Sequence, residues 1–251
     1  ELLEKPNIGA LTLVQQKHEA TARPGFAEET YKSALRAYIS ALATAKGEAA
    51  GALIKKADGT MNLLNEAVAA SPDGPKKLFA IYYSLARDLE QQMQLATPET
   101  KKNLALGFET FLNQVRSTAT ELNVLYWVAS TYHSMGDSYG LGPNNQIAPD
   151  AKRYYGEAAK SFQDILDRGK SGKLQVEGQL QGQIGLQLAK TRRAMGEYDA
   201  AIKLFMETLA KSPALLSVQT EAAKTYEEWA DRSGDSKYYL HAIQGSMENR
   251  T

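Results

Sequence analysis

The sequence predicts an all-α protein built from antiparallel helix hairpins that stack on one another. Apolar residues recur at three- and four-residue steps, the period of one helical face, in one segment after another. Glycine and proline stand between these segments, where they end one helix and open the next. Alternating runs rich in valine or isoleucine, which would indicate strands, are lacking. A β-sheet is therefore not expected.

The first part of the chain predicts three helices. One is expected over residues 6–19, a second over residues 26–45 and a third over residues 53–69. The second has the clearest apolar face, which consists of Phe26, Tyr31, Ala34, Leu35, Tyr38, Ile39 and Leu42. The third carries Asp58-Gly59 in its interior, and we expect an interruption there because glycine weakens a helix.

Ser71-Pro72-Asp73-Gly74-Pro75 is the strongest helix-breaking segment inside the chain. It predicts a division into N-terminal helical hairpins, residues 1–74, and helical repeats, residues 75–251. A loop inside one continuous solenoid over residues 1–251 explains the same residues, so both organisations stay open.

After this break, Thr97-Pro98-Glu99 predicts an N-cap followed by proline at the first helical position. The helices before and after it should form an α-hairpin. Further helices are expected at about residues 119–135, 150–168, 174–195, 197–211, 214–233 and 236–248.

Composition narrows the classes of function. The chain has 251 residues, of which 43% are hydrophobic and 23% charged, as is normal for a globular protein. Lys plus Arg (29) equals Asp plus Glu (29), so no net field favours nucleic acid or an anionic membrane surface. No stretch approaches the roughly 18 consecutive apolar residues of a membrane span. The lack of cysteine excludes disulfides, thiolate metal sites and thiol nucleophiles.

Motifs for catalysis or cofactor binding are not found. The three histidines, His18, His133 and His241, lack the helical pairing with glutamate that a zinc protease needs. There is no GxSxG nucleophile elbow and no glycine-rich phosphate loop. The acidic and amide residues of segment 137–150 do not follow the spacing of a calcium loop, which favours a plain solvent loop. We therefore expect no catalytic residue, no metal and no cofactor, and we do not expect an enzyme.

Residues 182–213 carry the most specific motif in the chain. They read GQIGLQLAKTRRAMGEYDAAIKLFMETLAKSP. Gly196 permits a tight turn, Ala201 is small where two helices cross, Phe205 fills the space between hairpins and Pro213 ends the pair. This pattern resembles the second half of a tetratricopeptide repeat (TPR). In the first half, Gly185 and Arg192 stand where the family has a bulky anchor and a tyrosine.

Two weaker units flank this repeat, so the resemblance covers roughly residues 120–250. The upstream unit has Leu125, Val128-Ala129, Tyr132, Gly136, Ala158 and Phe162, with an insertion of about 17 residues from Asp137 through Arg153. The downstream unit has Ala223, Tyr226, Ala230 and Gly234-Asp235. Residues 1–118 match no repeat family by their residues.

The resemblance implies a right-handed α-α superhelix in which the first helix of each pair lines the inner, concave surface. Carried over position by position, that surface has Asn123, Tyr126, Ser130 and His133, then Gln183, Leu186, Lys190 and Arg193, and last Glu221, Lys224, Glu228 and Asp231. Tyrosine and arginine are common anchors of interfaces, so Tyr126, His133, Lys190 and Arg193 should cradle an acidic or aromatic peptide. The alternative is that these are ordinary exposed helix residues.

The carboxylate clamp of chaperone-binding relatives is not expected. Tyr126 and Ser130 stand where that clamp has its first lysine and asparagine, and Glu221 replaces a later lysine. The bound segment should therefore be held by other chemistry.

The resulting prediction is a protein–protein interaction scaffold that binds a protein or peptide partner on the concave face. The alternative is a helical-repeat domain that binds a small ligand or a glycan in its groove, as part of a larger exported bacterial protein. Loop 137–150 discriminates between them, because folding across the concave face would favour the ligand. The chain begins at Glu1 without Met, so we expect a processed product whose compartment, cytoplasm or periplasm, stays open.

Overall fold

The computed structural model describes the chain except residues 1, 46, 70–72, 143–145, 212–215 and 249–251. The described residues form eleven α-helices and two short 3-10 helices, so the predicted all-α class is confirmed. Within these residues the only extended pairing is an isolated bridge between Leu141 and Ile147. None of the described helices combines the length and the apolar character that a membrane crossing requires.

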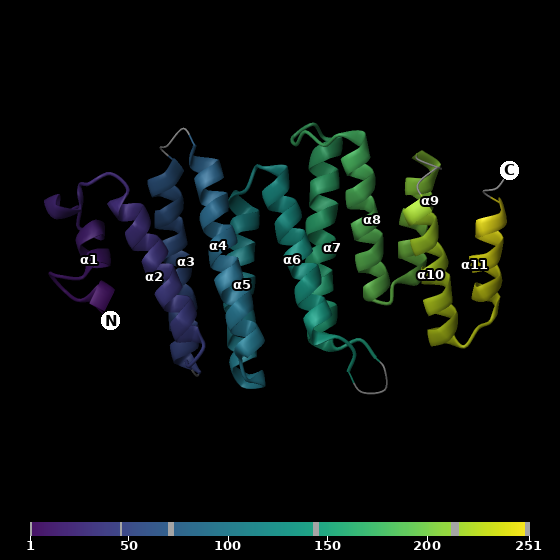
Figure 1. Cartoon of the computed structure of the whole chain (residues 1–251), viewed down its shortest axis with the longest axis horizontal. Coiled ribbons are helices and arrows are strands. Elements are labelled where there is room, and N and C mark those ends of the chain that lie inside the picture. The colour runs from purple at the N-terminus through teal and green to yellow at the C-terminus, as the bar shows by residue number, and fades with distance from the viewer. Residues whose placement is uncertain (1, 46, 70–72, 143–145, 212–215, 249–251) are drawn as a thin grey trace. The chain divides into compact units, whose positions relative to one another are not determined.

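The chain divides into two compact units, Glu1–Thr118 and Ala119–Thr251. The first unit holds η1 (Leu2–Glu4), α1 (Ala10–Gln15), η2 (Glu19–Thr21), α2 (Phe26–Leu42), α3 (Glu48–Ala69), α4 (Gly74–Leu95) and α5 (Pro98–Thr118) (Figure 1). The second unit holds α6 (Leu122–Tyr139), α7 (Pro149–Lys170), α8 (Gly178–Ala194), α9 (Tyr198–Lys211), α10 (Leu216–Ser233) and α11 (Lys237–Glu248).

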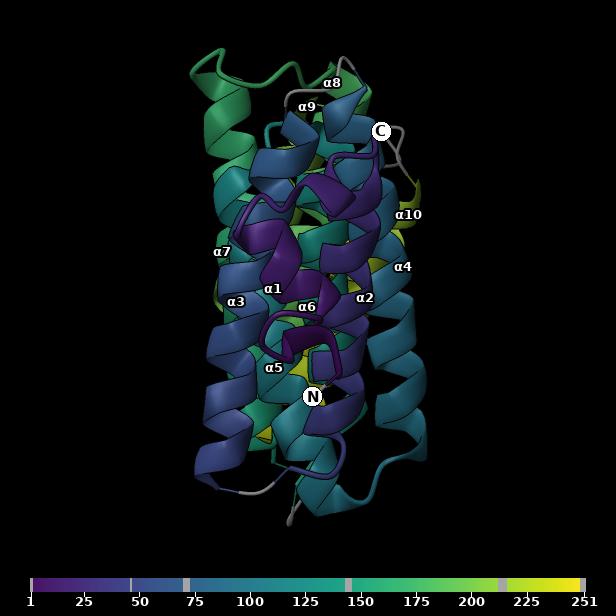
Figure 2. The same ribbon diagram turned by 90° about the vertical axis from the view of Figure 1, so that its left-hand side faces the viewer.

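In the first unit, α2, α3, α4 and α5 pack against one another as a bundle. α2 contacts all three of the other long helices, and so does α3. Figure 2 views this unit from the side of α1, with α2 and α3 side by side behind the short helix. The division expected after residue 74 lies inside this bundle, at the start of α4.

The interruption expected at Asp58-Gly59 is wrong, because α3 runs unbroken from Glu48 to Ala69. A Cβ atom added at Gly59 would meet nothing within 4 Å, so no close neighbour forces a bend there. Packing of α3 against α2 outweighs the weak local preference of one glycine. The N-cap expected at Thr97 is confirmed, since its hydroxyl accepts a hydrogen bond of 3.4 Å from the amide of Thr100.

In the second unit each helix packs chiefly against the helices before and after it in the chain. The contacts run from α6 to α7, α8, α9, α10 and α11 in order, and α8 also touches α10. This nearest-neighbour pattern is typical of repeat architectures. The right-handed superhelix itself stays a prediction.

The turn and core positions of the 182–213 motif lie as the residue types suggest. Gly196 has φ +77°, which favours glycine because it has no Cβ, and it links α8 to α9. Ala201 and Phe205 are fully buried in a cluster with Leu209, Val218 and other apolar residues.

Gly136, expected to be a turn glycine, lies inside α6, which continues to Tyr139. Its role is close packing, because a Cβ atom there would lie 2.5 Å from ring atoms of Tyr155 on α7. The insertion after it therefore extends α6 and α7, and residues 140–148 join the two helices.

Candidate functional site

The residues predicted to line one surface of the second unit lie on α6, α8 and α10. These are the helices that the repeat pattern assigns as the first of each pair. Side-chain contacts join α6 to α8 and α8 to α10, so some of the predicted residues take part in one connected set. We call this set the polar seam: His133 on α6; Lys190, Thr191 and Arg193 on α8; and Glu221, Thr225 and Glu228 on α10.

The predicted residues of α6 that precede His133 lie outside the polar seam. Asn123 is exposed, and Ser130 is half-buried. Tyr126 is half-buried, and its ring meets the buried ring of Phe162 on α7 edge-on, with 5.8 Å between centroids. Much of Tyr126 therefore packs the α6–α7 hairpin, which makes it a poorer interface anchor than its residue type suggests.

His133 joins three helices. Its Nδ1 lies 2.9 Å from Oγ1 of Thr191 on α8, and its ring centroid lies 5.3 Å from that of Tyr155 on α7. The Thr191 hydroxyl donates to the carbonyl of Gln187 at 2.8 Å, so it accepts from Nδ1–H of His133. Nε2 then takes up the proton when the ring becomes charged, and it faces Oδ2 of Asp137 at 3.8 Å.

The surroundings of His133 favour its neutral form. Burial lowers the pKa of the imidazole below its ordinary value of 6.5, and the nearby positive charges of Lys190 and Arg193 lower it further. Asp137 opposes this shift by raising the pKa, but it does not outweigh burial.

The four predicted residues of α8 differ in exposure. Gln183 is exposed, and Leu186 packs against the buried cluster around Phe205. Lys190 is half-buried, and its charge acts on both His133 and Glu221. Gln183 and Lys190 are therefore better placed than Leu186 to meet a partner.

Arg193 is the most heavily engaged residue of the seam. Its Nη2 lies 2.7 Å from Oε2 of Glu221, and its Nε lies 3.6 Å from Oε1 of Glu228. Its Nη1 donates to the backbone carbonyl of Glu221 at 3.3 Å and, at 3.5 Å, to Oγ1 of Thr225. The side chain is only 14% exposed. Arg193 therefore ties α8 to α10, and its charge is already neutralised within the protein.

Glu221 stays ionised in this environment. Burial on its own would raise the pKa of the carboxyl, but the charge and hydrogen bond of Arg193 and the charges of Lys190 and Lys224 together lower it. Lys224 also lies 3.4 Å from Oε1 of Glu221. The carboxylate is thus held between cations on two helices.

The remaining predicted residues lie further along α10. Glu228 is 49% exposed even though it reaches Arg193. Asp231 is exposed and accepts a hydrogen bond from the hydroxyl of Tyr239 on α11. These two carboxylates leave acidic groups at the solvent side of α10.

Two members of the seam were not expected from the sequence. Thr191 and Thr225 are fully buried, and each has a hydroxyl that bonds the backbone carbonyl four residues earlier. Each also contacts a charged or titratable side chain of a neighbouring helix, His133 and Arg193 respectively. A polar residue at a core-facing helical position is the sequence signal that identifies them.

The described part of loop 137–150 lies beside a turn. A Cβ atom added at Gly196 would lie 3.3 Å from Cδ1 of Ile147, so this loop residue packs against the α8–α9 turn. The loop is closed by hydrogen bonds from Gly142 N to Gln146 O, 2.6 Å, and from Ala148 N to Gly140 O, 3.3 Å. Asn144 and Asn145 of this loop lie outside the described residues.

Across the described ranges, no group of three or more acidic or histidine side chains is arranged to hold a metal ion. No model of a known protein family matches the sequence. A search of curated proteins also finds no match. The likeness to TPR proteins therefore rests on the residues quoted above.

Proposed function

We propose that this protein is an interaction scaffold without chemistry of its own, and that it binds a partner segment along α6, α8 and α10. The observation that carries the proposal is the polar seam. Contacts from His133 to Thr191 and from Arg193 to Glu221 link three helices that are not consecutive in the chain. A surface held in register by such contacts is pre-organised, which lowers the entropic cost of binding an extended partner.

The engagement of Arg193 changes the chemistry expected of the partner. An acidic peptide was expected to use both Lys190 and Arg193, but Arg193 already faces two carboxylates. Lys190 supplies positive charge near α6, while Glu228 and Asp231 supply negative charge on α10. A segment with an acidic residue at one end and a basic residue at the other complements this arrangement.

The described part of loop 137–150 also supports the scaffold over a ligand enclosed by that loop. Ile147 packs against Gly196 in the α8–α9 turn, which follows the last residue of α8.

Site-specific photocrosslinking tests the proposal. A benzophenone amino acid is placed at Gln183, which is exposed on α8, and in a matched variant at Met206, which is 52% exposed on α9. Each variant is irradiated in a lysate of the source organism. We expect a discrete crosslinked species from position 183 and not from position 206.

Reversal of the charge at Lys190 provides a second test of the proposal. Lys190→Glu should reduce the crosslinked product at position 183 by about fivefold or more, as expected for loss of an interface anchor. Lys203→Glu, an exposed charge reversal on α9, should leave the product unchanged. Equal products from positions 183 and 206, or no effect of Lys190→Glu, would contradict binding along this face.

A further inference from the structure

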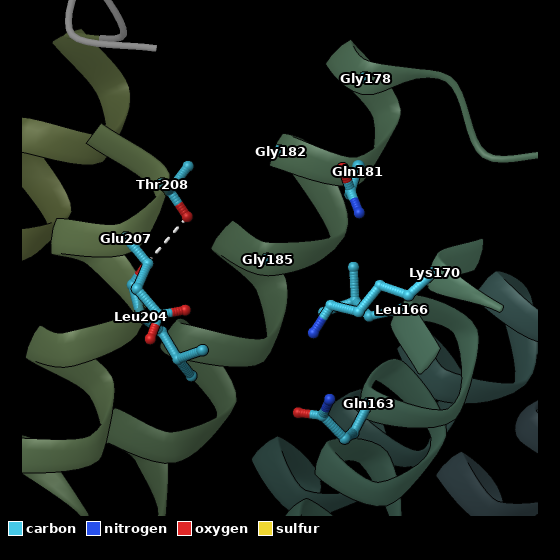
Figure 3. A pocket seen from close by; sticks show the side chains of 10 residues that line it. All are labelled: Gln163, Leu166, Lys170, Gly178, Gln181, Gly182, Gly185, Leu204, Glu207 and Thr208. Atoms are coloured by element: carbon cyan, nitrogen blue, oxygen red, sulfur yellow. Dashed lines mark hydrogen bonds between the residues drawn. The ribbon is translucent and has the colours of Figure 1, made fainter. Parts of the chain in front are cut away.

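A cavity of about 270 Å³ lies where α7, α8 and α9 meet (Figure 3). Its volume is close to the lower end of the range for small-molecule sites. It is lined by a different strip of α8 from the one that carries Lys190 and Arg193. The cavity is therefore separate from the polar seam and from the function proposed for it.

The backbone of α8 forms one side of the cavity because Gly178, Gly182 and Gly185 share this face. Gly185 is explained by packing, since a Cβ atom there would lie 3.3 Å from Oγ1 of Thr208. Gly182 has no such explanation, because a Cβ atom there would meet nothing within 4 Å. Glycine in a helix interior is unfavourable relative to alanine, so Gly182 leaves the cavity open at a cost to the helix.

The remaining walls combine apolar and charged groups. Leu166 of α7 and Leu204 of α9 supply apolar surface. Lys170 extends from α7 and Glu207 from α9, and both are exposed (Figure 3). The ion pair of Lys170 with Asp167 is long, 3.9 Å, and both side chains are more than half exposed. Such a pair is weak, so Lys170 is able to meet a ligand.

Opposite charges on exposed side chains that line a partly apolar cavity point to a ligand with both charges and an apolar group. We propose that this cavity binds a free α-amino acid with an aliphatic side chain. Its carboxylate would meet Lys170, its ammonium group would meet Glu207, and its side chain would lie between Leu166 and Leu204. Gln163 and Gln181 add amide groups that are able to hydrogen-bond either end.

The lining residues fit other ligand classes less well. Within the part of the chain that the structure describes, the lining has no aromatic ring, although rings are the surfaces on which planar ligands stack. Among the described residues the lining has a single cation and no arginine, whereas phosphate recognition favours bidentate arginine or several positive charges. The balance of one positive and one negative charge is what a zwitterion matches.

An NMR titration of the ¹⁵N-labelled chain, residues 1–251, with L-leucine tests this inference. We expect the amide signals of Gly178, Gly182 and Gly185 to shift in a saturable way. L-Leucinamide, which lacks the carboxylate, and 4-methylpentanoate, which lacks the ammonium group, should each bind about tenfold more weakly. Equal affinity for all three compounds, or no saturable shift with L-leucine, would overturn the proposal.

Two matched glycine variants locate the site. Gly182→Leu fills the cavity and should abolish the L-leucine shifts, while helix propensity keeps α8 stable. Gly51→Leu, at an exposed glycine of α3 with open space around it, should leave the titration unchanged. Binding that survives in Gly182→Leu would place the ligand elsewhere. Failure of either arm leaves the crosslinking result at Gln183 unaffected, so the two proposals are tested independently.

Discussion

Arg193 on α8 and Glu221 on α10 form an ion pair of 2.7 Å, with 14% and 17% of their side chains exposed. The same guanidinium also donates to the backbone of Glu221 and reaches Glu228. A pair this far from water differs from a surface salt bridge, because removal of one partner leaves a charge that water cannot fully solvate. A single substitution at Arg193 or Glu221 should therefore disturb the packing of α8 against α10.

Arg193→Ala should lower the free energy of unfolding by about 2 kcal/mol, since Glu221 loses its principal partner while partly buried. Urea denaturation followed by circular dichroism measures the change. The double variant with Glu221→Gln should recover part of the loss, because the unpaired charge is then absent. Lys203→Ala removes one member of an exposed pair with Asp199 and serves as the control, with no measurable change. Equal effects of the two single substitutions would show that burial of Arg193 is unimportant.

The protein should lose stability as the pH falls below about 6.5, in part through His133. The pKa of this imidazole is lowered in the folded state, chiefly by burial, so the unfolded chain binds more protons between the lowered pKa and 6.5. Stability from this group is complete above 6.5 and declines as the pH falls through that window. Asp137 on α6, Tyr155 on α7, and Lys190 and Arg193 on α8 are the titratable groups that face it.

Urea midpoints at about pH 7.5 and pH 5.5 measure the effect of His133. His133→Gln keeps a neutral polar group at this position and should show a smaller difference between the two midpoints than the wild type. An NMR titration of the His133 ring reports its pKa directly. The same pH dependence in both proteins, or a pKa above 6.5, would refute the assignment.

Two glycines on facing helices should respond oppositely to alanine. Gly136→Ala brings a Cβ atom to 2.5 Å from the Tyr155 ring, and such overpacking should destabilise the protein by about 1–3 kcal/mol. Gly156→Ala places its Cβ atom at an ordinary 3.9 Å from Met195 Cε and should stabilise α7 by up to about 1 kcal/mol. Thermal unfolding of both variants gives the comparison. A stable Gly136→Ala protein would mean that Tyr155 moves aside freely.

Residues 119–251 should fold without the first unit, because they form a compact unit with a continuous series of helix contacts. Circular dichroism of this fragment should show a helical spectrum and a cooperative urea transition. The polar seam is tested in the same sample by adding Arg193→Ala, which should lower the midpoint as in the full chain. A fragment without cooperative unfolding would show that residues 1–118 are needed for its stability.

Several elements were predictable because their signals are local. The helix that begins at Phe26 begins there in the structure, after a glycine with positive φ. Thr97 caps α5 as its side chain and the following proline predict. Gly196 required no tertiary information either, since a turn that demands positive φ favours glycine.

Other features depended on neighbours that are distant in the sequence. The sequence pattern marks Gly136 as a turn residue, but the ring of Tyr155 makes it a packing residue inside α6. Tyr126 has the residue type of an interface anchor, and its contact with Phe162 is set by the α6–α7 packing. The residues that flank Gly136 and Tyr126 in the sequence do not specify either of these contacts.

The sequence by itself determined the helical class and most helix ends. It did so because periodicity, capping and turn residues act over a few neighbouring positions. Only the tertiary structure decided that Arg193 is committed to Glu221 and Glu228, which leaves Lys190 as the better-placed cation of α8 for a partner. Those contacts join residues about 30 positions apart, and their strength depends on burial, which no local pattern specifies.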